Sequence, residues 1–104
     1  MEINRILEEA TLLSDVKEHL KITWDEEETN SAIKSIIKDA IPTLNFKLGA
    51  DIDYSISGME HRLFLNYCLY AWNDCLNEFD NYYLNEIYQI RSKYEVKYYE
   101  ENQV

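Results

Sequence analysis

Glycine, proline, cysteine and basic residues are all scarce in this chain. Its 104 residues include 2 Gly, 1 Pro and 2 Cys, and 10 Lys and Arg stand against 20 Asp and Glu, for a formal net charge of −10. With so little Gly and Pro the chain has few places to turn, which favours helices over hairpins. The length is that of one domain, residues 1–104, and 46% hydrophobic residues are enough to build its core.

The shortage of basic residues argues against a direct grip on duplex DNA. Such binding needs clustered Lys and Arg that displace counterions from the phosphates. The sequence has no run of 18 apolar residues, and its first ten residues, MEINRILEEA, are acidic where a signal peptide would be basic and then apolar. We therefore expect a soluble protein that is made in the cytoplasm and does not bind membranes.

The cysteines and histidines form no frame for a disulfide or a metal site. Cys68 and Cys75 fall in one predicted helix, about 10 Å apart along its axis, too far for a bridge within the chain. His19 and His61 are distant from both in sequence, so a four-ligand zinc site has no pattern to support it. We interpret the cysteines as small core residues and expect neither a metal nor a cofactor.

Hydrophobic periodicity predicts an all-α fold, a bundle of three to five helices joined by short loops. The predicted helices are residues 2–10, 15–22, 27–44, 58–79 and 81–98. The segment 58–79 is nearly all-round apolar in its middle third, so we expect it to be the long central helix of the bundle. Residues 81–98 are then the C-terminal helix.

Several residues are expected to mark the ends of these helices. Ser14 is the predicted N-cap of the second helix, and Pro42 should bend the third before a ragged end near Gly49. Residues 49–58 alternate polar and apolar side chains, the one place for a short extended segment. Residues 99–104 have no cap and are expected to fray.

Catalytic motifs are missing. There is no glycine-rich phosphate loop, no Gly-x-Ser-x-Gly and no His-Glu-x-x-His. The acidic run 25–28 is either a solvated loop that favours the next helix N-terminus or a metal cluster, although consecutive carboxylates on a helix point in different directions. Glu60 and His61 are an acid and a base, but neighbouring helical residues point about 100° apart, which favours a solvated helix start. The sequence therefore indicates a protein that is not an enzyme.

Tyrosine is abundant towards the end of the chain. Six of the nine tyrosines fall between Tyr82 and Tyr99. They are either boundary packing residues of the bundle or part of a protein interface, where aromatic side chains are enriched.

Two stretches resemble the small helical head–tail connector proteins of tailed bacteriophages, also called adaptor or head-completion proteins. The first is LSDVKEHLKITWD at 13–25, followed by an acidic stretch and a helix with paired isoleucines. The second is YCLYAWND at 67–74 with LNEF at 76–79, YLNEI at 83–87 and QIR at 89–91, which is similar to a Gln-Leu-Arg stretch in part of that family. The resemblance covers about residues 12–97. Ser92 stands where related members tend to have Gly, and the loop 48–58 departs from the family pattern.

The resemblance implies a structural virion protein at the head–tail interface rather than an enzyme. Its subunits form a homo-oligomeric ring that docks under the portal protein, extends the DNA channel and joins the capsid to a tail-side head-completion or stopper protein. DNA would pass nearby without specific binding, and the negative charge fits, because a ring of acidic subunits repels phosphates. The subunits can remain monomeric until they dock.

In the resembled family the C-terminal helix and tail take part in docking. We therefore place the portal contact on Tyr94, Tyr98, Tyr99 and the frayed end, and count Arg91 with them as a partner-binding candidate. Arg91 is expected to form an ion pair, with an acid of its own chain favoured over one of a neighbouring subunit.

The acidic residues of the second half are candidates for the channel wall. Between residues 48 and 90 the sequence has seven acids against the single base Arg62. Among these acids, Asp74 and Glu78 are the channel-lining candidates.

The charge also permits two other classes of function. One is an acidic DNA mimic that inhibits a nucleic-acid-binding protein; here the acids are interrupted by Tyr, Asn and Lys, and the charge divides evenly, −5 for residues 1–52 and −5 for 53–104. The other is a generic helical adaptor that binds through the aromatic last helix. Closed cyclic symmetry separates a connector from an adaptor that pairs once.

Overall fold

The structure, a computed structural model, describes the backbone of residues 2–101 and the side chains of residues 9–101. Its elements are α1 (Glu2–His19), α2 (Glu27–Leu48), α3 (Met59–Trp72), the 3-10 turn η1 (Leu76–Glu78), α4 (Phe79–Tyr82) and α5 (Leu84–Glu101). No strand occurs in this described part. The predicted all-α fold is confirmed.

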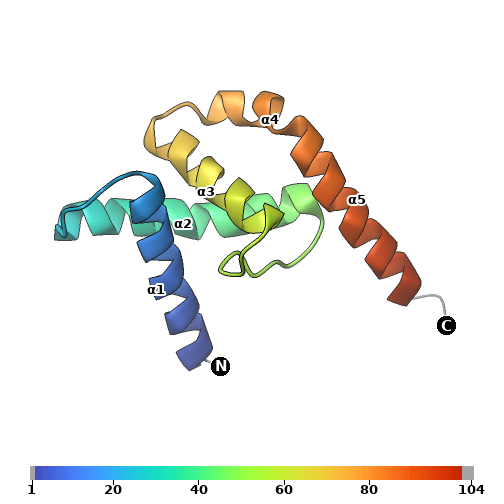
Figure 1. The fold of residues 1–104 in the computed structure, drawn as a ribbon, viewed down its shortest axis with the longest axis horizontal. Coiled ribbons are helices and arrows are strands. Elements are labelled where there is room, and N and C mark those ends of the chain that lie inside the picture. The colour runs from blue at the N-terminus through green and yellow to red at the C-terminus, as the bar shows by residue number, and fades with distance from the viewer. Residues whose placement is uncertain (1, 102–104) are drawn as a thin grey trace.

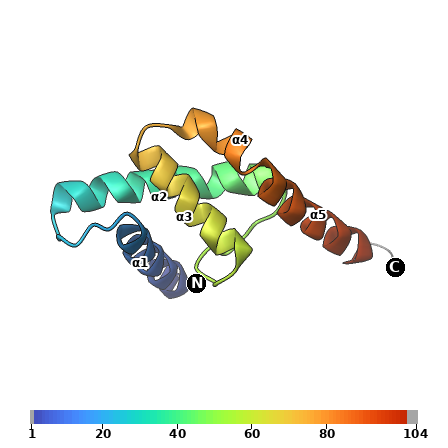
Figure 2. The same cartoon turned by 45° about the horizontal axis from the view of Figure 1, so that its top comes forward.

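Helix α2 is the longest element and packs against α1, α3 and α5 (Figure 1). The predicted central segment supplies α3, which packs on α2 and also contacts α1 and α5. Helix α5 leaves the body at the end opposite to the start of α2 and extends away from it, as both views show (Figures 1 and 2). The two ends of the long axis therefore carry different elements.

The core follows from the apolar spacing of α2. Ile33, Ile37, Ala40, Leu44 and Leu48 recur at intervals of three and four residues and are all buried, so one stripe of the helix faces the other helices. Each large aliphatic side chain buried in this way contributes about 1.5–3 kcal/mol to folding. The remaining core consists of Leu12, Val16, Ile22, Ile52, Tyr54, Leu63, Phe64, Tyr67, Cys68, Phe79, Ile87 and Ile90.

Three helices stop at residues with a left-handed backbone. Lys21 (φ 61°), Gly49 (φ 73°) and Asp74 (φ 57°) follow α1, α2 and α3. After α1, the amide of Ile22 donates to the carbonyl of Lys17 at 2.9 Å, which satisfies an acceptor that the helix leaves open. The predicted end of α2 near Gly49 is confirmed.

The predicted division of the N-terminal region into two helices is wrong. Helix α1 runs without interruption, so Ser14 lies within it and is not an N-cap. No glycine or proline breaks this segment, and Leu12 and Val16 are both buried on the same stripe. Burial of this common stripe therefore keeps the two predicted helices continuous as one helix.

Helix α2 continues past Pro42 to Leu48. Proline removes the amide donor to the carbonyl of Lys38, and the Thr43 hydroxyl donates to the neighbouring carbonyl of Asp39 at 2.8 Å, so it does not replace the missing bond. Burial of Leu44 and Leu48 holds the last turns in place. Packing outweighs the local preference for ending the helix at proline.

The predicted helix 58–79 is also wrong in its second half. Helix α3 ends at Trp72, the Asn73 side chain donates to the carbonyl of Leu69 at 2.9 Å, and Asp74 turns left-handed. The chain then reverses through η1 and α4. Phe79 is thereby brought back onto Tyr67, with ring centroids 5.0 Å apart.

The break places the two cysteines in different elements. Cys68 is buried in α3 and Cys75 lies in the following turn, and both are free. Burial raises the pKa of the Cys68 thiol to about 12, so this thiol stays protonated at neutral pH. The interpretation of Cys68 as a core residue is confirmed.

Residues 49–58 form an irregular loop instead of an extended segment. Asn45 organises it: its side-chain oxygen accepts from the Tyr54 hydroxyl at 2.8 Å and from the Ile52 amide at 3.3 Å. Tyr54 is fully buried and stacks on Phe64 at 4.9 Å.

The predicted fraying of residues 99–104 is wrong for its first part. Residues 99–101 continue α5 as helix, and residues 102–104 lie outside the described residues.

Candidate interaction site on the C-terminal helix

Helix α5 has an anchored half and a projecting half. Ile87 and Ile90 are buried against the core, and Tyr94 is the last partly buried residue. Every side chain from residue 95 to residue 101 is exposed. We call residues 95–101 the α5 tip; in Figure 1 it is the part of α5 that extends beyond the body.

Tyr94 is occupied within its own chain. Its hydroxyl donates to the Glu60 carboxylate at 2.7 Å, and Lys93 donates to the same oxygen at 2.8 Å. Burial and the hydrogen bond to Glu60 raise the pKa of Tyr94 to about 12. Burial alone would raise the pKa of Glu60, but the hydrogen bonds from Lys93 and Tyr94 outweigh it and hold that pKa below its ordinary value. This contact fastens α5 to α3 and leaves the Tyr94 ring only partly exposed.

Arg91 also has partners in its own chain. Its Nε donates to Glu95 at 3.2 Å, and its Nη1 donates to the carbonyl of Lys47 at 3.4 Å. Lys47 in turn pairs with Asp80 at 2.9 Å. The structure therefore gives Arg91 the intrachain ion pair that was expected.

Tyr98 and Tyr99 lie on the α5 tip. They expose 70% and 65% of their surface, and Val96 exposes 58%. Of the predicted partner-binding tyrosines, these two keep large accessible rings. The α5 tip is thus the part of the predicted site that can meet another molecule.

The abundance of tyrosine near the C-terminus has two structural explanations. Tyr83 packs on Phe79 and Tyr70, with centroids 4.9 and 5.7 Å apart, so it serves the bundle like Tyr94. Tyr82 and Tyr88 are mostly exposed, like Tyr98 and Tyr99. Boundary packing accounts for some of these side chains and leaves the others on the surface.

The channel-lining candidates form a separate surface. Asp74 and Glu78 lie on the reversal between α3 and α4, away from the α5 tip (Figure 2). Both are exposed, and no ion pair joins either to a residue of the described chain. Asp74 also has a backbone role, because its left-handed conformation ends α3. The structure does not bring these acids together with the predicted docking tyrosines.

Glu60 and His61 point to different partners. Glu60 contacts α5, whereas His61 Nδ1 lies 2.6 Å from the carbonyl of Tyr54 and its Nε2 lies 3.7 Å from Asp15. The pair therefore does not converge on one point, as the helical spacing indicated. Among the side chains of residues 9–101 no group of three or more His, Cys, Asp or Glu is placed to hold a metal ion.

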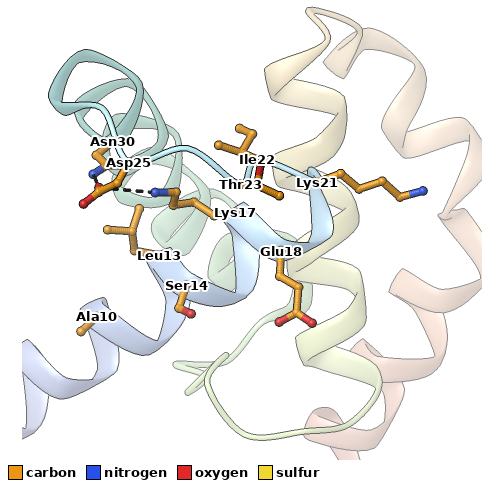
Figure 3. A pocket seen from close by; sticks show the side chains of 10 residues that line it. All are labelled: Ala10, Leu13, Ser14, Lys17, Glu18, Lys21, Ile22, Thr23, Asp25 and Asn30. Carbon is orange, nitrogen blue, oxygen red and sulfur yellow. Dashed lines mark hydrogen bonds and ion pairs between the residues drawn. The ribbon is translucent and has the colours of Figure 1, made fainter.

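A groove beside α1 was not found from the sequence. It runs between α1 and the segment that leads to α2 (Figure 3). Its lining residues are Ala10, Leu13, Ser14, Lys17, Glu18, Lys21, Ile22, Thr23, Asp25 and Asn30. The sequence assigns these residues only to a helix and a loop, and no spacing rule indicates that the loop stands away from α1.

One end of the groove is polar, and an exposed lysine, Lys21, lies at its other end. Lys17 turns towards Asp25, 3.7 Å away, and Asn30 donates to the same carboxylate oxygen at 2.7 Å (Figure 3). The hydrogen bond from Asn30 and the charge of Lys17 lower the pKa of Asp25. The Lys21 side chain points away from this cluster (Figure 3), is exposed, and forms no ion pair with an acid of the described chain.

The chain matches no protein-family model, no curated protein and no solved structure. Among the described residues, no helix is long and apolar enough to cross a membrane.

Proposed function

We propose that this chain is a subunit of a head–tail connector ring in a tailed bacteriophage. The ring docks under the portal, extends the DNA channel and receives a tail-side head-completion or stopper protein. The resemblance of residues 12–97 to that family supports the proposal. The observation that carries it is the α5 tip, a helical arm with exposed Tyr98 and Tyr99 that contributes no buried side chain to its own bundle.

Such an arm is typical of a subunit that completes its surface by assembly. Aromatic rings contribute binding free energy when a partner covers them, and interface centres are enriched in tyrosine. The anchoring contacts of Glu60 with Lys93 and Tyr94 fix the direction in which the arm leaves the body. The arm is therefore presented to a partner in a defined orientation.

The acidic surface supports a place beside DNA rather than on it. The net charge is −10, and Asp74 and Glu78 remain unpaired on an exposed turn. Repeated around a ring, these carboxylates repel phosphates and let DNA slide through without a grip. A DNA mimic is less favoured, because Glu60, Asp80 and Glu95 are each engaged by a cation of the chain itself.

Coexpression with the neighbouring phage proteins tests the proposal. The full chain is expected to copurify with the portal protein, and truncation after Tyr94 is expected to abolish this association. The truncated chain should keep its cooperative melting, because residues 95–101 are all exposed. Circular dichroism checks that only the helicity of the lost residues disappears.

Tyr88→Ala is the matched control. Tyr88 is an exposed tyrosine on the anchored half of α5, so its loss should leave portal association unchanged. Undiminished association of the truncated chain would remove the α5 tip from the interface. Capture of a single non-capsid protein in place of the portal would favour the adaptor class.

A further inference from the structure

We propose that Glu60 is a positioning residue for docking of the α5 tip: it lies on another helix, outside the tip, and the affinity for the portal nevertheless depends on it. This inference rests on the proposed function and names what sets the orientation of the same site. Glu60 acts through Lys93 and Tyr94, the two α5 residues that bond to its carboxylate. We call these three residues the α5 latch.

The α5 latch is a close cluster of charged and polar groups. One carboxylate oxygen of Glu60 accepts from Lys93 Nζ at 2.8 Å and from the Tyr94 hydroxyl at 2.7 Å. The Lys93 ammonium also lies 4.8 Å from the centre of the Tyr94 ring. The Glu60 side chain is only 18% exposed, which strengthens these charge-assisted hydrogen bonds. The lowered pKa of Glu60 keeps its carboxylate charged at neutral pH.

The latch is placed where α5 leaves the body. Ile90 is the last buried residue of the helix, and Tyr94 is the last one with a partly buried side chain. The hydrogen bond from Arg91 to the carbonyl of Lys47 is long, at 3.4 Å, and exposed. The contact that prevents α5 from pivoting about Ile90 is therefore made by the Glu60 carboxylate.

A pivot at Ile90 would carry the tip out of register with its partner. Tyr99 is nine residues further along the helix, a rise of about 14 Å, so a tilt of about 20° displaces it by about 5 Å. Aromatic rings contribute most to binding when they fill a well-packed pocket, and such a displacement empties the pocket. An arm that is already held in one direction also avoids the cost of being ordered on binding.

Graded variants of Glu60 test this role. Glu60→Ala removes the acceptor of the latch and is expected to weaken portal association about three- to tenfold, because the portal must then order the tip as it binds. Glu60→Gln keeps a neutral oxygen that can accept from the Tyr94 hydroxyl, so it should retain part of the affinity. Glu60→Lys should lose the affinity, and the double variant Glu60→Lys, Lys93→Glu restores opposite charges and should recover part of it.

Ile33→Val is the matched control for a general loss of stability. It removes one methyl group from a fully buried side chain near the start of α2, so it lowers the melting temperature without touching the latch. Glu28→Gln, an exposed glutamate without an ion pair, controls for the loss of one negative charge. Both variants should bind the portal as the wild type does.

Two measurements on the full-length chain separate a displaced tip from an unfolded protein. NMR relaxation gives the backbone order parameters of residues 95–101, which should fall below about 0.6 in Glu60→Ala while those of α2 stay unchanged. Binding to purified portal particles gives the affinity of each variant. A purely structural Glu60 would lower the melting temperature and move neither quantity.

Unchanged portal affinity in Glu60→Ala, or order parameters of the tip that stay at the wild-type level, would overturn the positioning role. If truncation after Tyr94 still abolishes association in that case, the proposed function stands without it. A loss of affinity that Ile33→Val reproduces at the same melting temperature would assign the effect to stability and would also overturn the role. A wild-type chain with no affinity for the portal overturns the proposed function, and the docking role of Glu60 with it.

Discussion

Single residues far apart in the sequence decide how α5 is held. Glu60 receives hydrogen bonds from residues 33 and 34 positions later, Lys93 and Tyr94. No local pattern indicates such a contact, so the sequence alone groups Tyr94 with Tyr98 and Tyr99 as docking residues. All three tyrosines lie on one helix, and nothing in the local sequence tells them apart. Only the position of α3, which brings Glu60 to Tyr94, distinguishes Tyr94 from Tyr98 and Tyr99.

Glu60 makes the stability of the fold depend on acid pH. Its pKa in the folded protein is below the ordinary 4.5, so the unfolded chain binds its proton more tightly. The stabilisation is fully present above pH 4.5 and is lost as the pH falls through the lowered pKa. Glu60→Gln is therefore expected to lower the free energy of unfolding at pH 7. In this variant the free energy of unfolding should also fall less steeply than in the wild type between pH 5 and pH 3.

Urea unfolding at several pH values measures this dependence. Glu28→Gln, an exposed glutamate without an ion pair, is the control and should keep the wild-type slope. An equally steep decline in Glu60→Gln would show that other carboxylates carry the effect.

Arg91 links α5 to the end of α2 and to its own next turn. Arg91→Glu loses the hydrogen bond to the Lys47 carbonyl and places a glutamate one turn before Glu95. We expect a loss of about 1 kcal/mol, because the ion pair is exposed and each contact is individually weak. Thermal melting should fall while negative-stain images of rings stay intact; dispersed rings at unchanged melting temperature would place Arg91 between subunits.

At the scale of elements, periodicity predicts where helices lie better than where they stop. The apolar stripe of α2 and the end at Gly49 follow from spacing and from the usual glycine at a helix end. The break after Trp72 does not, because Asn73 and Asp74 are ordinary helix-surface residues by pattern. Asp tolerates the left-handed region better than most residues, but tertiary packing of Phe79 decides that the chain reverses there.

Asp74 tests this explanation of the break. Asp74→Gly should keep or raise the melting temperature, because glycine adopts φ 57° without a steric penalty. Asp74→Val should lower stability by about 1–2 kcal/mol, because a branched side chain is strained there. Equal melting temperatures of the Asp74→Gly and Asp74→Val variants would mean that the backbone relaxes to another conformation. Thermal unfolding by circular dichroism distinguishes these outcomes.

On the scale of the whole molecule, two surfaces stand at opposite ends of one elongated body. The α5 tip was anticipated by its tyrosines and by the resemblance to connector proteins. The groove was not, because it arises from the way the segment before α2 stands off α1, and its lining residues carry no common spacing. Composition indicates that the molecule is acidic and helical, whereas the placement of its surfaces depends on packing over long sequence separations.

Imaging of the complex purified with the portal tests the connector account most directly. Negative-stain electron microscopy of coexpressed portal particles, followed by class averaging, shows whether this chain adds density on the portal axis. We expect a closed ring at the tail-side end of the portal, with an open channel through its centre. Portal particles that stay bare in the presence of the folded, full-length chain would contradict the account.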